Sequence, residues 1–191
     1  MSPVDVRTGM DREDFLKLSG AGLTGAVLRG TGVTAGATAQ TGPPLEAFFG
    51  KASTRYGVPE RLREAMGYVN TLWVMPPPSA TPFDPADLHG RGAYGLMQLE
   101  QNPFKNTLGR AASLTGPSEK EIKTGRSANV EGRATVLSDL AGPDGPPDIN
   151  GWYEIISRYG SGPLYAHDVY AVLQGGASAT ISTGERIELT P

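Results

Sequence analysis

The residues best suited to chemistry gather in the short stretch from Gly92 to Leu99. It combines two glycines, Gly92 and Gly95, with an aromatic side chain, Tyr94, and an amide, Gln98. Glycine allows unusual backbone angles and lets another molecule approach the backbone closely. The remaining apolar residues of the stretch should be buried, which leaves Tyr94 and Gln98 at the edge. We therefore expect this stretch to form the floor of a groove.

Three carboxylates near this stretch are candidate acids or bases. Glu100 shares the side of Gln98 if the chain is extended there, because side chains alternate along a strand. Asp84 and Asp87 lie in a proline-containing loop at residues 75–91, and loops of this length often carry function. The alternative, a solvated surface carboxylate, is the commoner situation for each of the three.

The sequence holds no evident set of metal ligands. Cysteine is absent, and His89 and His167 are the only histidines. A zinc site needs three or four ligands, mostly Cys and His. We expect both histidines to be solvated or structural, and we expect neither a metal nor a cofactor.

Composition narrows the classes of partner. The formal net charge is -3, without a long run of either sign, and 38% of residues are hydrophobic. Nucleic acid is not an expected partner, because phosphate binding needs clustered Lys and Arg. No apolar run approaches the roughly 20 residues that span a bilayer, so no integral membrane segment is expected. The chain is long enough for one compact domain with a tail at each end, and we expect a monomer.

Residues 1–39 have the layout of an export signal. A charged start is followed by small and apolar residues and by the small-x-small end Ala37-Thr38-Ala39. The charged start resembles a twin-arginine signal, in a degenerate form with Glu13 in place of the second arginine. Such a signal would make the protein secreted or cell-wall associated. The alternative is an unstructured or amphipathic tail.

Helical spacing of apolar residues predicts an all-α domain of six or seven short helices at residues 45–176. Residues 40–44 would be a linker. Residues 177–191 alternate like a strand without a partner and would form an extended tail or linker. Asn70 lies at the edge of the second helix's apolar face, and Trp152 belongs to the expected core. The expected helices span residues 45–56, 59–73, 108–114, 118–122, 127–140, 152–159 and 165–173.

The order of several motifs resembles a known family, the lysozyme-like soluble lytic transglycosylase domain, which cleaves the glycan strands of peptidoglycan. The resemblance is closer still to a version of this domain in secreted actinobacterial N-acetylmuramoyl-L-alanine amidases, where it precedes a separate zinc amidase domain. It covers nearly all of residues 45–189. The motifs are Arg55–Pro59, Gly67–Trp73, Gly92–Gln98, Ala111–Gly116, Ala128–Gly132 and Trp152–Gly160.

The resemblance implies a site in which one residue departs from the family. The family's general acid is a glutamate near the end of the second helix, and Asn70 matches it here. An amide has no proton to give at neutral pH, and losing a general acid costs on the order of a hundred- to ten-thousandfold in rate. Tyr94, Gln98 and Tyr159 would line the sugar groove beside Asn70. The alternatives are a core aromatic for Tyr159 and a backbone-bonding amide for Gln98.

We therefore expect an exported, peptidoglycan-associated module that binds glycan strands without cleaving them efficiently. One alternative is weak glycan cleavage, with Glu100 or a loop aspartate as a fallback acid. The other is a truncated N-acetylmuramoyl-L-alanine amidase whose zinc ligands would lie beyond Pro191.

Overall fold

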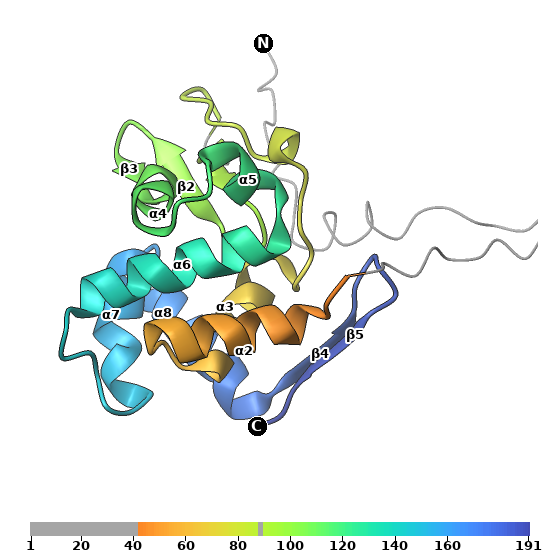
Figure 1. Cartoon of the computed structure of the whole chain (residues 1–191), viewed down its shortest axis with the longest axis vertical. Coiled ribbons are helices and arrows are strands. Elements are labelled where there is room, and N and C mark those ends of the chain that lie inside the picture. The colour runs from red at the N-terminus through yellow and green to blue at the C-terminus, as the bar shows by residue number, and fades with distance from the viewer. Residues whose placement is uncertain (1–41, 88–89) are drawn as a thin grey trace, which may run out of the picture. The chain divides into compact units, whose positions relative to one another are not determined.

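The structure, a computed structural model, describes residues 42–87 and 90–191 (Figure 1). The predicted export segment at residues 1–39, the first two linker residues and His89 lie outside the described residues. The described elements are α2 (Leu45–Tyr56), α3 (Glu60–Thr71), η1 (Pro78–Ala80), β1 (Ala93–Tyr94), β2 (Leu99–Asn102), β3 (Lys105–Asn106), α4 (Thr107–Thr115), α5 (Glu119–Thr124), α6 (Arg126–Ala141), η2 (Asn150–Trp152), α7 (Tyr153–Tyr159), α8 (Pro163–Gly175), β4 (Ala177–Thr180) and β5 (Arg186–Leu189).

The prediction of an all-α domain is wrong, because the helices are accompanied by two small antiparallel sheets. In the first sheet, β1 pairs with β2 and β2 pairs with β3, with Tyr94 opposite Leu99 and Gln101 opposite Asn106. These strands have two to four residues. An apolar pattern over so few residues cannot separate a strand from a helix turn, so helical spacing alone missed them.

The second sheet corrects the prediction of an extended C-terminal tail. Strands β4 and β5 pair in register from Ala177 with Leu189 to Thr180 with Arg186. The alternation in β5 is real: Ile187 and Leu189 are buried and their neighbours are exposed. Its partner strand, Ala-Ser-Ala-Thr, has small side chains and therefore gives almost no apolar signal in the sequence.

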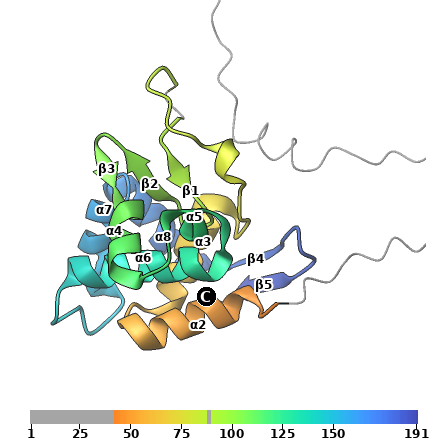
Figure 2. The ribbon, with the colours of Figure 1, turned by 45° about the horizontal axis from the view of Figure 1, so that its top comes forward.

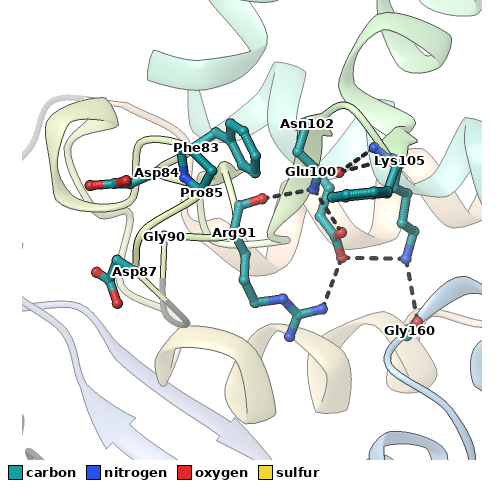
Figure 3. Close-up of a pocket in the computed structure, with 11 residues that line it drawn as sticks. Phe83, Asp84, Pro85, Asp87, Gly90, Arg91, Glu100, Asn102, Lys105 and Gly160 are labelled. Atoms are coloured by element: carbon teal, nitrogen blue, oxygen red, sulfur yellow. Dashed lines mark hydrogen bonds and ion pairs between the residues drawn. The ribbon is translucent and has the colours of Figure 1, made fainter.

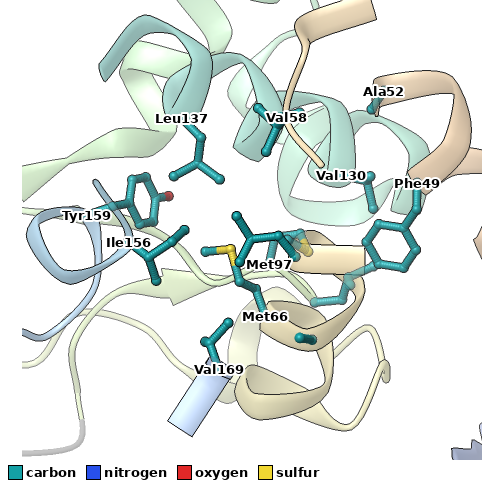
Figure 4. Close-up of a cluster of buried hydrophobic side chains, with 14 of the residues drawn as sticks. Phe49, Ala52, Val58, Met66, Met97, Val130, Leu137, Ile156, Tyr159 and Val169 are labelled. Carbon is teal, nitrogen blue, oxygen red and sulfur yellow. The ribbon is translucent and has the colours of Figure 1, made fainter. Parts of the chain in front are cut away.

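Helix α6 is the centre of the described domain. It packs against α2 and α4, and also contacts α5, α7 and β2. Figures 1 and 2 show α2 on one side of α6 and the sheet β1–β2–β3 on the other. The core between these elements draws side chains from widely separated segments, including Phe49, Met66, Met97, Val130 and Ile156 (Figure 4). Trp152 is buried in this core, as predicted.

Helix α3 ends earlier than the apolar spacing suggested. Leu72 and Trp73 adopt left-handed backbone angles, with φ of 54° and 61°. Their backbone N–H groups donate to carbonyls of the last turn, and the Trp73 indole donates to Glu64 O at 2.7 Å. These bonds satisfy the helix end and place Asn70 in its last turn. Among the helices of the described residues, none has the length and apolar character to cross a membrane.

Candidate functional site

The turn between β1 and β2 is built around the glycines of the Gly92–Leu99 stretch. Gly92, Gly95 and Gln98 have φ of 64°, 72° and 52°. A Cβ on Gly95 would lie 2.6 Å from Asn129 Oδ1, which is closer than side chains allow. From the sequence, we expected these glycines to let another molecule approach the backbone closely. In the structure, the space at Gly95 is filled by the protein's own Asn129.

Asn129, on α6, is fully buried and holds this turn in place. Its Oδ1 accepts from Met97 N at 2.8 Å, and its Nδ2 donates to Tyr94 O at 3.2 Å and Ile122 O at 3.0 Å. Arg133, one turn further along α6, donates to Met97 O at 2.7 Å. Because α6 satisfies these buried backbone groups, the turn can direct its apolar side chains into the core.

Tyr94 and Gln98 remain half-buried at the edge of this turn. The Gln98 amide donates to Gly95 O at 2.8 Å, which is the local backbone bond considered as its alternative role. The Tyr94 ring faces the Lys123 ammonium, with Nζ 4.1 Å from the ring centroid. Both side chains therefore have partners within the protein.

Tyr159 and Tyr165 lie around the buried Arg133. The guanidinium of Arg133 sits 3.4 Å from the centroid of the Tyr159 ring and donates to Tyr165 OH at 3.2 Å. Tyr159 is only 3% exposed, and burial raises the pKa of its phenol. Burial also raises the pKa of Tyr165, against the opposing effect of the Arg133 charge. Asn70 Nδ2 is buried without a hydrogen-bond partner among the described residues. Tyr159 thus occupies the core position considered as its alternative.

A separate pocket of about 520 Å³ lies beside the first sheet (Figure 3). Its walls come from the two ends of the loop between Phe83 and Arg91, from the β2–β3 hairpin and from Gly160. The pocket brings together Glu100 and the loop residues Asp84 and Asp87, the three carboxylates singled out in the sequence. The residues predicted for the sugar groove, Asn70, Tyr94, Gln98 and Tyr159, do not line it.

Glu100 is held on the pocket wall by two cations. Its Oε1 lies 3.3 Å from Lys105 Nζ and 3.4 Å from Arg91 Nη2, and its side chain is 13% exposed. Lys105 also donates to the carbonyls of Tyr159 and Gly160 at the end of α7. Burial lowers the pKa of the Lys105 ammonium, and Glu100 partly offsets this effect. The wall is therefore an internally paired polar surface.

The pKa of Glu64 is the one most suited to an acid, but Glu64 does not line this pocket. Burial, followed by repulsion from Glu60 and Glu46, raises the pKa of Glu64 to about 7. A general acid works best with a pKa near the working pH. The pocket wall holds Glu100 instead, with its Oε1 engaged by donors. The carboxylate with the raised pKa, Glu64, therefore lies outside the pocket.

No metal centre is assembled in the parts of the chain that the structure describes. Within residues 42–87 and 90–191, no three His, Cys, Asp or Glu side chains are grouped to hold a metal ion. His167 is exposed on α8, with Nδ1 3.9 Å from Asp168.

Sequence reasoning missed the residues that complete the pocket wall: Arg91, Asn102, Phe104 and Lys105. One signal was present. Asn102-Pro103-Phe104 places an aromatic residue in a segment with turn chemistry, where a large apolar side chain has no obvious core to enter.

Comparison with known proteins finds no family model, no curated protein and no solved structure that matches this chain. The resemblance to lysozyme-like transglycosylase domains therefore remains a prediction from the motifs.

Proposed function

We propose that this chain is an exported, cell-wall-associated module that binds peptidoglycan glycan strands without cleaving them efficiently. In this proposal it is a divergent relative of lysozyme-like transglycosylase domains and acts as a monomer. The observation that carries the proposal is the pocket beside the first sheet. It combines polar, charged and aromatic side chains, which suits a ligand rich in hydroxyl groups.

Two positions support the proposed lack of efficient cleavage. Asn70, which matches the family's acid, cannot donate a proton at neutral pH. Glu100, the carboxylate on the pocket wall, already accepts from Lys105 and Arg91. A general acid must instead present its proton to the glycosidic oxygen. Neither residue supplies a free acid.

The test is cosedimentation of the full chain with purified peptidoglycan, run beside an assay for released muropeptides. We expect the protein to sediment with the walls and to release no muropeptides. If the chain does not sediment with walls, the proposed function is wrong.

Two variants test which residue is responsible for any lytic activity. Asn70→Glu restores a carboxylate at the matched position, and lysis by this variant alone would support a groove that lacks only its acid. Glu100→Gln keeps the shape of the pocket wall but removes its carboxylate. Lysis by the natural chain that this change abolishes would favour the alternative function, weak glycan cleavage through Glu100.

A further inference from the structure

Phe104 is the most exposed large hydrophobic side chain of the described residues, at 93%. It lies between β2 and β3, where it lines the pocket described above. Covering a phenylalanine side chain is worth about 1.5–3 kcal/mol. Leaving it in water at the entrance of a pocket therefore gives a bound molecule a surface to cover.

The backbone under Phe104 is held in place by its neighbours. Asn102 Oδ1 accepts from the backbone N–H groups of Phe104 and Lys105, both at 2.9 Å, and Asn102 Nδ2 donates to Arg91 O at 2.8 Å. Lys105 ties the same hairpin to Gly160 O at 3.3 Å. These bonds fix the hairpin tip before any ligand arrives, so that little conformational freedom is lost on binding.

The surroundings of Phe104 are polar. Figure 3 shows Arg91, Glu100, Asn102 and Lys105 on the same pocket wall. The Arg91 side chain is 52% exposed, and toward the described residues its guanidinium donates only through Nη2, to Ser161 Oγ at 2.8 Å and to Glu100 Oε1 at 3.4 Å. Its other N–H groups can reach a ligand in the pocket.

A ligand that fits this wall has one apolar face and an edge rich in oxygen. A pyranose ring meets both conditions: its C–H groups form an apolar face, and its hydroxyl groups surround the ring. A protein partner would instead favour a larger apolar patch around the aromatic residue. The pattern here is one aromatic ring among charged and amide groups.

We propose that Phe104 is the platform on which one pyranose ring of the glycan stacks, with Arg91 donating to oxygens at the edge of that ring. This inference rests on the proposed function and places the sugar against the β2–β3 hairpin, away from Asn70 and Gln98. Phe104 and Arg91 are then the residues that determine affinity for the sugar.

The test uses the full chain and isothermal titration with soluble glycan strands prepared from purified peptidoglycan. Phe104→Ala should weaken binding about tenfold, the loss expected for one aromatic contact. Phe104→Trp should retain binding, and the fluorescence of the new indole should change on titration. Arg91→Gln should also weaken binding several-fold.

Leu164→Ala is the matched control. Leu164 is 74% exposed and does not line the pocket, so its loss removes exposed apolar surface elsewhere and should leave affinity unchanged. Wild-type affinity in Phe104→Ala would overturn the stacking inference while leaving the proposed function standing. If the natural chain binds no glycan strands, the proposed function fails and this inference fails with it.

Discussion

At the residue scale, two glycines with nearly the same backbone angle have different reasons to be glycine. Gly57 and Gly95 have φ of 68° and 72°. A Cβ on Gly57 would meet nothing within 4 Å, whereas one on Gly95 would overlap the amide of Asn129. The pair therefore separates the cost of a left-handed backbone from the cost of a steric overlap.

Gly95→Ala should destabilise the fold by on the order of 3 kcal/mol, because backbone strain and the displacement of buried Asn129 add together. Gly57→Ala should lose only the strain contribution, about 1–2 kcal/mol. Urea denaturation of both variants measures the difference. Equal losses would show that the Asn129 contact does not constrain the turn.

Also at the residue scale, the shifted pKa of Glu64 makes the folding stability depend on pH. Its pKa is raised from 4.5 to about 7, first by burial and then by Glu60 and Glu46. The folded state therefore holds this proton more tightly than the unfolded chain does. The resulting stabilisation is fully present below about pH 4.5 and is lost as the pH rises through about 7.

Glu64→Gln removes this titration and should raise the melting temperature at pH 8 while changing it little at pH 5. Glu154→Gln, at an exposed position on α7, is the control and should have no such pH-dependent effect. Melting curves at the two pH values test the prediction. A Glu64→Gln gain of the same size at both would contradict it.

At the element scale, the C-terminal hairpin contacts the first residues of two helices. Glu185, in the β4–β5 turn, accepts from Leu45 N at the start of α2 and pairs with Arg126 at the start of α6, at 3.0 Å. The N-cap residue of α2, Pro44, supplies no side-chain bond. A carboxylate at helix N-termini also opposes the positive end of each helix dipole. The hairpin thus caps α2 and forms an ion pair with the first residue of α6, although both helices are distant from it in sequence.

Glu185→Gln should destabilise the domain by about 1–2 kcal/mol, since it weakens a charge-assisted cap and a half-buried ion pair. The control is Glu188→Gln on the same hairpin, where the pair with Arg186 is exposed and spans 3.8 Å. Exposed pairs contribute little, so this variant should unfold like the natural protein. Chemical denaturation measures both, and indistinguishable midpoints for the two variants would rule out the capping role.

At the scale of the whole described domain, α6 joins the first sheet to the last helices. Asn129 and Arg133 lie one turn apart on its buried face and bond to the Gly92–Leu99 turn. Arg133 also contacts Tyr159 and Tyr165, which follow much later in the chain. Burying a charge is costly unless it is hydrogen-bonded. Within the described residues Arg133 donates to Met97 O and Tyr165 OH and its Nε has no hydrogen-bond partner. Tyr159, which the sequence placed in the sugar groove, is therefore packed in the core.

Local pattern in the sequence determined several elements of this protein. The apolar spacing at residues 45–56 predicted α2 with its observed bounds, and Ser118 with Glu121 predicted the capping box that begins α5. The stretch Gly92–Leu99 was also recognised as unusual. These features depend on residues within one or two turns of each other, so the sequence displays them directly.

Tertiary structure decided the rest, because the deciding contacts join residues far apart in the chain. Ala177–Thr180 became a strand only because Arg186–Leu189 returned beside it with two buried apolar side chains. Gly95 is glycine because Asn129 reaches it from α6. The pocket is lined by residues from separate segments, and Lys105 on the β2–β3 hairpin donates to the carbonyl of Gly160 across it. The spacing of residues along the chain does not predict such long-range contacts, so they can be identified only in the folded structure.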